Sequence, residues 1–405
     1  MKHILTLAFL LSIIAALAAC TSDTSDKRPA DAARTTGDTA AADTVKKAKR
    51  LNADGIDTVT FNVTDTTITL KQQNFPTPGG RVVNVMVTGV DSRLGDPMGH
   101  ADANHLVRFF LDSGFVEIIS IPRDTPSDAG FDDTTGLNKL TNVRANRGRN
   151  SYLKAVCEIA NVPKIDYYVE FGFSQAIGLL EMLGYKDNAA STLRVLRSRQ
   201  AYSAGDFQRV YNQGQFMRQI MLRHFEKTDG LIGDLALRAA LALVETNLSY
   251  DACSNVLDEL RSHGFGTDAS RVWVRLKPAM ISKFTVYDFS VENVNEINKQ
   301  IDHKIHRLGL DSVQINEDTY ERRLSRLVEK AAADSARSPG SVIRLLRRAY
   351  EQRAWLQVSE QGRRRQYRDR MCGLLGSAYR RTKNHAAAQA IDSYLQLENG
   401  VSGDR

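Results

Sequence analysis

Cysteine is scarce in this 405-residue chain, with only four residues, at Cys20, Cys157, Cys253 and Cys372. Their wide spacing matches none of the patterns by which cysteines bind zinc. Cys20 follows an export signal, described below, which leaves three cysteines, an odd number. We therefore expect no disulfide framework and interpret these three as small, buried, apolar side chains.

Long apolar runs are also missing after the first twenty residues. No later segment approaches the roughly 20 consecutive apolar residues that a membrane-spanning helix needs. Hydrophobic residues nevertheless make up 42% of the chain, which is ordinary for a globular protein. We expect the rest of the chain to fold outside the bilayer, tethered by its N-terminus, with room for two domains.

Residues 1–20 have the pattern of a bacterial lipoprotein signal. Lys2 provides a positive start, an apolar run covers residues 4–19, and small residues lead directly into Cys20. Cleavage would make Cys20 the lipid-carrying N-terminus and leave the protein membrane-anchored, facing the periplasm or cell envelope. The alternative is an ordinary signal peptide or membrane anchor in which the cysteine is accidental.

Residues 21–55 almost lack large apolar side chains and are rich in Thr, Asp, Ala, Ser and Lys. Such a segment cannot bury enough apolar surface to offset the entropy of ordering it. It is predicted to be a disordered linker.

Short apolar runs at residues 81–90, 106–111 and 116–121 are bounded by Gly, Asp and Pro, which is typical of strands in a sheet covered on both faces. Residues 112–114 predict a tight turn between the last two. Alternation over residues 58–70 predicts a strand pair or an edge hairpin. Further strands are expected over 165–171 and 271–276, and helices over 150–160, 174–184, 206–226, 231–245 and 249–264. The mixture predicts an α/β domain at 56–280, with a central mixed β-sheet flanked by helices.

Polar side chains gather where these predicted strands end. They include Asp91 and Arg93 after the first, Asp102 before the second, and Arg123 and Asp124 after the third, with Lys139, Arg197 and Arg199 further on. Asp206, Arg209 and Gln213 share one face of a predicted helix. Ligands collect at strand ends in open α/β sheets. Carboxylates there suit Mg²⁺, and several Arg and Lys suit a diphosphate, so the pattern fits phosphoryl transfer.

The order of these motifs resembles the LytR-CpsA-Psr family over about residues 80–280. That family has, in succession, G-x-D-S-R, R-S-D, I-P-R-D, K-I-N, R-S-R and a D-x-x-R-x-x-R-Q helix. The matching segments are Gly89-Val90-Asp91-Ser92-Arg93, His100-Ala101-Asp102, Ile121-Pro122-Arg123-Asp124, Lys139, Arg197-Ser198-Arg199 and the helix from Asp206 to Gln213.

The resemblance implies an enzyme that moves a glycan phosphate from a polyprenyl-diphosphate carrier to peptidoglycan or another envelope acceptor, with Mg²⁺. By it, Asp91 and Asp102 would hold the metal, and Asp91, Arg123 and Arg209 would be catalytic. The diphosphate would be bound by Arg93, Arg123, Lys139, Arg197, Arg199, Arg209 and Gln213. Two alternatives stay open: Arg93 only pairs with Asp91, and Asp124 caps the following loop.

Three departures from the family pattern favour another reading. His100 replaces the first Arg of R-S-D, Asn212 replaces the second Arg of the helix motif, and only about a dozen residues separate Gly184 from Arg197. The alternative is a non-catalytic lipoprotein scaffold or binding protein that keeps the fold. A generic phosphohydrolase also remains open, because water can replace the acceptor.

Residues 281–405 are expected to form a smaller, all-α region. Residues 374–394 resemble a tetratricopeptide repeat, although a plain helical hairpin is an equal alternative. Between Glu321 and Lys383 the chain has 17 Lys and Arg against 6 Asp and Glu, a net charge of +11, so the remainder of this +7 chain carries −4. For an exported protein this favours anionic wall polymer, phospholipid headgroups or a protein partner, and we expect no nucleic acid.

Overall fold

The structure, a computed structural model, describes residues 66–70, 77–91, 94, 99–199, 205–228, 230–279, 282–307 and 317–402. The predicted signal, Cys20, the predicted linker and Arg93 lie outside these ranges. Within them, every helix is too short or too polar to cross a bilayer.

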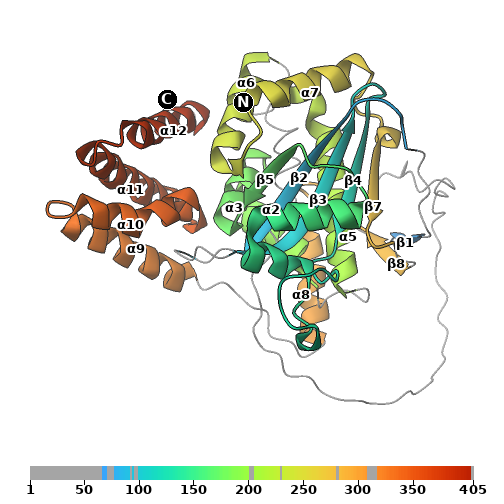
Figure 1. The fold of residues 1–405 in the computed structure, drawn as a ribbon, viewed down its shortest axis with the longest axis horizontal. Coiled ribbons are helices and arrows are strands. Elements are labelled where there is room, and N and C mark those ends of the chain that lie inside the picture. The colour runs from blue at the N-terminus through green and yellow to red at the C-terminus, as the bar shows by residue number, and fades with distance from the viewer. Residues whose placement is uncertain are drawn as a thin grey trace.

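A six-stranded sheet forms the centre of the molecule (Figure 1). Its strands are β2 (Val82–Asp91), β3 (His100–Phe110), β4 (Phe115–Ile121), β5 (Tyr167–Phe171), β6 (Glu245–Thr246) and β7 (Val272–Leu276). They lie in the order β6-β5-β2-β3-β4-β7. The β2–β5 and β4–β7 pairs are parallel and the others antiparallel. The predicted α/β fold with a mixed sheet is confirmed.

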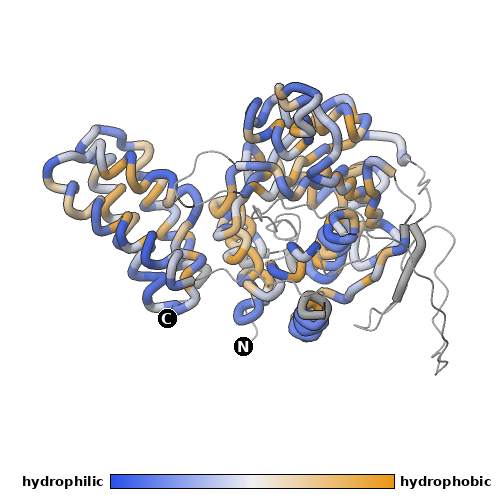
Figure 2. Tube along the Cα trace, turned by 90° about the horizontal axis from the view of Figure 1, so that it is seen from below, coloured by the Kyte–Doolittle hydropathy of each residue, from blue (hydrophilic) through white to orange (hydrophobic). Residues whose placement is uncertain are grey.

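Helices cover both faces of the sheet. On one face, α2 (Leu140–Ala160) packs on a cluster that includes Met86, Leu106 and Ile119. On the other face lie α3 (Phe173–Met182), α4 (Ala189–Arg197) and α5 (Gly205–His224), which share a core with Val87 and Val107. Burial on both faces explains why most of the strands are largely apolar runs. In Figure 2, hydrophobic segments, coloured orange, recur throughout the larger part of the molecule.

One expected boundary of the sheet was wrong. β3 begins at His100, not at residue 106, because its polar first half pairs with residues 87–91 of β2, so Asp102 lies inside the strand. The first part of the strand pair predicted over residues 58–70 lies outside the described residues. Its last part, β1 (Thr66–Leu70), pairs with β8 (Ser282–Val286), more than 200 residues later.

Two expected helix starts were also wrong. α2 begins at Leu140 and continues past a break at Gly148, whose φ of 80° is non-helical. α3 begins at Phe173, so Ser174 lies in its first turn. The Gln175 side chain accepts from the Gly172 N–H there, at 2.6 Å.

The α/β unit continues past residue 280. After α6 (Gly230–Leu243) and α7 (Tyr250–Ser262), which Ser249 caps as predicted, β8 leads to α8 (Val294–Arg307). Arg194 of α4 donates to Asn298 of α8, at 2.9 Å. The short segment after Gly184 is therefore packed against α8.

Four further helices form the C-terminal helical module: α9 (Glu317–Asp334), α10 (Pro339–Glu351), α11 (Gln361–Arg381) and α12 (His385–Ser402). α9 and α11 lie side by side and parallel. Arg363 pairs with Glu321 near their N-termini, and Arg381 donates to the Ala336 carbonyl just past the C-terminus of α9. These are two stacked hairpins, and the tetratricopeptide resemblance stays a prediction.

The short helix η5 (Ala354–Gln357) packs this module against α3. Trp355 is completely buried, and Gln357 donates to the Ser174 hydroxyl at 2.6 Å. Arg364 pairs with Glu181 of α3 at 2.7 Å. The three cysteines in the described residues are free, and Cys253 and Cys372 are buried as expected, whereas Cys157 is half-buried.

Candidate functional site

Asp102 is aimed by an irregularity in the sheet. Gly89 of β2 faces Ala103 of β3, but Val90 faces Ala101, so Asp102 is an extra residue in a β-bulge. Bulges bend a strand and redirect a side chain. The buried Asp102 carboxylate accepts from Arg123 at 3.0 Å and from the Thr141 hydroxyl at 3.1 Å.

Arg123 and Thr141 belong to the two ends of one loop, which runs from β4 to α2. The Thr141 N–H donates to the Arg123 carbonyl at 3.0 Å, and the Leu140 N–H donates to that of Thr125 at 2.9 Å. Lys139 pairs with Asp124 at 3.1 Å. The base of the loop thus brings Arg123 and Lys139 together, as the sequence predicted. Asp124 here forms an ion pair with Lys139.

Arg209 reaches Asp102 from the opposite side, on α5. Its guanidinium is 2% exposed and lies 2.6 Å from the Asp206 carboxylate. It also donates to the Asp102 backbone carbonyl at 3.3 Å. Asp206 and Arg209 share a helix face, as their spacing predicted. Two arginines from different elements therefore converge on one aspartate.

Gln213, one turn further along α5, has both polar atoms of its side chain engaged. Its oxygen lies 3.2 Å from His105 Nε2, and its nitrogen donates to the Leu196 carbonyl at 3.1 Å. Gln213 is fully buried, so it links α5 to the end of α4, where Arg197 and Arg199 follow. The diphosphate contact that the resemblance implies for Gln213 stays a prediction.

His105 is fully buried between Gln213 and the Ser120 hydroxyl, which lies 2.7 Å from Nδ1. Burial lowers the pKa of His105 to about 3, a shift that the charge of Arg209 reinforces and the hydrogen bond with Gln213 opposes. His105 was not predicted from the sequence, because it stands just before the apolar run at 106–111 and matches no motif.

Asp91 ends β2 at the same edge of the sheet. Side chains alternate along a strand, and Val87 faces α5, so Asp91 lies on the face from which Arg209 approaches. Within the described ranges no three His, Cys, Asp or Glu side chains could hold a metal together. Mg²⁺ commonly uses one or two carboxylates and takes its other ligands from water and substrate phosphate. The pair Asp91 and Asp102 fits that donor set.

Arg197 lies over the ring of Phe173, 5.0 Å from its centroid, at the start of α3. Arg199 follows the end of α4. Arg93 cannot be placed, because it lies outside the described residues.

A polar network on the α2 face was not predicted. Tyr152 of α2 donates to Asn104 at 2.7 Å and lies 3.1 Å from the Thr88 hydroxyl. Asn104 in turn donates to the carbonyls of Ala101 and Ile121, next to the bulge and to Pro122. The network therefore joins α2 to the strand ends that carry Asp102 and Arg123.

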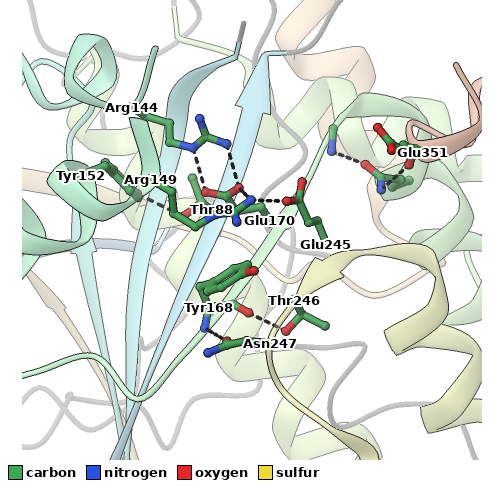
Figure 3. Close-up of polar contacts among 12 residues, drawn as sticks. Thr88, Arg144, Arg149, Tyr152, Tyr168, Glu170, Glu245, Thr246, Asn247 and Glu351 are labelled. Atoms are coloured by element: carbon green, nitrogen blue, oxygen red, sulfur yellow. Dashed lines mark hydrogen bonds and ion pairs between the residues drawn. The ribbon is translucent and has the colours of Figure 1, made fainter. Parts of the chain in front are cut away.

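Figure 3 shows the neighbouring ion pairs, in which Glu170 of β5 lies between Arg144 and Arg149 of α2, at 2.8 and 2.6 Å. Burial alone would raise the pKa of Glu170, but the two arginines outweigh it and hold that pKa below its ordinary value. Arg149 also pairs with Glu245 of β6. These contacts hold α2 to the sheet on both sides of its break at Gly148.

Two of the residues that differ from the family motifs, His100 and Asn212, lie among the described residues. His100 is exposed and faces Asp91 in the strand register. Asn212 is buried and accepts from Gln208 at 2.7 Å, while Gln208 also donates to the Thr285 carbonyl of β8. Position 212 therefore helps to hold β8 in this chain.

Comparison with known proteins gives one match that covers much of this site. Residues 56–184 match the LytR_cpsA_psr family. The predicted resemblance to LytR-CpsA-Psr proteins is thus confirmed. The matched residues contain Asp91, Asp102, Arg123 and Lys139, whereas Arg197, Arg199 and Arg209 lie beyond them.

Solved structures with a similar chain path include TagV of B. subtilis, with 15% identity, 56% of this chain and 98% of that chain covered, and a TM-score of 0.39. A transcriptional regulator from Enterococcus faecalis has 16% identity, 57% and 88% coverage, and a TM-score of 0.38. TagT bound to LIIa-WTA has 18% identity, 59% and 96% coverage, and a TM-score of 0.36. No curated protein matches the chain.

Proposed function

We propose that this protein transfers a glycan phosphate from a polyprenyl-diphosphate carrier to peptidoglycan or another polymer of the cell envelope. The observation that carries the proposal is the convergence of Arg123 and Arg209 on Asp102 at the edge of the sheet. The family match over residues 56–184 supports the same reaction class.

In this reaction an acceptor hydroxyl attacks the glycan-linked phosphorus. A new P–O bond forms, the bond to polyprenyl phosphate breaks, and the leaving phosphate takes the electron pair while the hydroxyl proton passes to water. Negative charge grows on the bridging and terminal oxygens. Arg123, Arg209 and Lys139 would stabilise it, since fixed cations in a partly buried site favour the transition state over the ground state.

Asp91 and Asp102 would hold Mg²⁺, which would neutralise charge on the diphosphate when bound. Thr141 and Arg123 orient the Asp102 carboxylate, leaving its geometry fixed before substrate arrives. Asp206 does the same for Arg209. Such preorganisation is the largest contribution that protein side chains make to phosphoryl transfer.

The test is Mg²⁺-dependent cleavage of a polyprenyl diphosphate by the purified full-length chain. Asp102→Asn and Arg123→Ala should each lower turnover by about 10²–10³-fold. Asp128→Asn and Arg147→Ala are matched controls, because this exposed ion pair joins the same loop to α2. The assignment is contradicted if the control variants lose activity, or if the site variants keep full activity.

The second candidate is a binding or scaffolding protein without turnover. Asn212 engaged with Gln208, exposed His100 and the docked C-terminal helical module favour it. In cells, this alternative predicts that Asp102→Asn is harmless, whereas Arg323→Glu with Arg326→Glu on the exposed side of α9 is not. The transferase predicts the reverse.

A further inference from the structure

The loop between β4 and α2 carries an unusual pair of side chains. Phe131 and Leu137 are the two large hydrophobic residues that are clearly exposed among the described residues, at 37% and 44%. Single exposed apolar residues are ordinary. Two on one short loop, beside a candidate site, are a feature to explain.

The loop holds these two side chains close together. Asn138, next to Leu137, accepts from the Phe131 N–H at 3.2 Å and donates to its carbonyl at 2.9 Å. The Leu137 carbonyl accepts from Asn142 at 2.7 Å. A single asparagine thus fixes the backbone of Phe131 beside that of Leu137.

The loop is also fastened to the α/β unit. Ala129 is buried against α2, and its carbonyl accepts from Asn146 at 2.6 Å. Asp128 pairs with Arg147 at 2.8 Å. A bridge between Pro126 and Lys139 closes the base. This is a closed, self-bonded loop of the kind that often has a function, and its tip is presented rigidly.

The base of the same loop is the candidate site, since Arg123 and Lys139 flank it. A polyprenyl diphosphate has its diphosphate at the headgroup level of a bilayer, with its chain in the acyl region. A protein that reaches this diphosphate must approach the bilayer with the mouth of its site. The apolar tip is then the part of the site region that can enter the acyl layer.

We propose that Phe131 and Leu137 insert into the lipid bilayer and seat the candidate site at the membrane surface. This inference rests on the proposed function. Charge attraction is not the cause, because residues 123–139 contain four aspartates against one arginine and one lysine. The contact is therefore apolar, like that of other side chains that anchor proteins at the interface, and does not need anionic lipid.

The test places a tryptophan at the tip. The full chain with Phe131→Trp is reconstituted in phosphatidylcholine vesicles whose acyl chains carry bromine, which quenches nearby indoles. The native Trp273 and Trp355 are buried and give a constant background. Ser377→Trp, at an exposed position of α11, is the control. Quenching at position 131 and none at 377 is the expected result.

Three outcomes overturn the proposal: no quenching at 131, equal quenching at both positions, or quenching at 131 only after polyprenyl diphosphate is added. The last would assign the tip to the substrate chain instead of the bilayer. None of these readings depends on turnover, so they stand even if the proposed transferase activity fails.

A second measurement uses turnover. Phe131→Ser with Leu137→Ser should raise KM for a polyprenyl diphosphate in vesicles by about tenfold or more, the loss expected for two apolar side chains. KM for a soluble short-chain diphosphate should not change. An equal effect on both substrates would assign these residues to the site itself and contradict membrane insertion.

Discussion

Asn104 connects the two chain segments that carry Asp102 and Arg123. Its amide nitrogen donates to Ala101 on one segment and to Ile121 on the other, and its oxygen accepts from Tyr152. All of these residues are buried. Removing one hydrogen-bond partner from a buried amide costs free energy. The positions of Asp102 and Arg123 therefore depend on the Tyr152 hydroxyl, which bonds Asn104.

Tyr152→Phe tests this dependence. It should lower the free energy of unfolding by about 1–3 kcal/mol, since Thr88 and Asn104 lose a buried partner, and it should lower kcat by letting Asp102 and Arg123 shift. Urea denaturation and steady-state kinetics measure the two effects. The control is Tyr367→Phe, whose hydroxyl bonds Glu321 in the C-terminal helical module. Unchanged kcat in a destabilised Tyr152→Phe variant would limit Tyr152 to folding.

His105 should make stability depend on pH. Its pKa is about 3 in the fold, mainly because of burial, but ordinary in the unfolded chain, so between these values the unfolded chain binds the extra proton. Stability is then full above about pH 6.5 and falls as pH drops toward 3, by up to about 1.4 kcal/mol per pH unit. His105→Asn should flatten this part of the pH profile, measured by denaturant unfolding. His263→Asn, at an exposed position, is the control, and an unflattened profile for His105→Asn would contradict the argument.

At this scale the sequence predicted the residues that stand at strand and helix ends. Asp102, Arg123, Lys139 and Arg209 were found by motif, and the structure brings them together. Thr141 stands where the family motif K-I-N has Asn, so a signal for it existed. Asn104 and His105 had none, because they precede the apolar run at 106–111, match no motif and find their partners on other elements.

At the scale of elements, α5 approaches the sheet through a glycine. A Cβ on Gly214 would lie 2.7 Å from both the Ser120 hydroxyl and a Val274 methyl. Ser120 lies on β4 and Val274 on β7, and these two strands are paired with each other in the sheet, so neither atom can move away freely. The helix that carries Arg209 can therefore lie this close only with Gly at position 214.

Gly214→Ala should lower the free energy of unfolding by about 1–3 kcal/mol through overpacking, despite the better helix propensity of Ala. It should also weaken turnover, since α5 carries Arg209 and Gln213. The control is Gly373→Ala on α11, where a Cβ meets nothing within 4 Å and helix propensity should add up to about 1 kcal/mol. Equal effects of the two substitutions, measured by thermal and denaturant unfolding, would refute the close approach.

Helix α2 shows why element boundaries were harder to predict than element types. Its second half was predicted from an apolar pattern, but its first half is rich in Asn and Arg, with Gly148 between the halves. The ion pairs of Arg144 and Arg149 with Glu170 hold both halves to the sheet. Such contacts depend on β5, some twenty residues away, and no local pattern contains them.

At the scale of the whole molecule, the sequence predicted an α/β part followed by helices but not how they join. β1 pairs with β8, and α8 packs on α4, across separations of more than 100 residues. The C-terminal helical module contacts α3 through η5, where Leu356 lies against Gly178. Three of the 17 basic residues counted between Glu321 and Lys383 are internal, since Arg353, Arg364 and Arg368 are buried.

Arg364 and Glu181 offer a test of this junction. The pair has two hydrogen bonds, at 2.8 and 2.7 Å, and Arg364 also donates to the Val358 carbonyl. Burial raises the pKa of Glu181 even though Arg364 opposes the rise. The free-energy cost of desolvating the two charges thus offsets much of their electrostatic attraction, as is common for buried ion pairs.

Arg364→Met alone should therefore destabilise the chain by about 3–5 kcal/mol, because it leaves a buried carboxylate without its cation. Adding Glu181→Gln should restore part of the loss, since the charge that needed compensation is gone. Denaturant unfolding of the two single variants and the double variant forms the cycle. Arg380→Met, which removes an exposed pair with Asp392, should cost less than about 1 kcal/mol. Additive single effects would show that Arg364 acts through packing and the Val358 carbonyl, and that the junction does not depend on the pair.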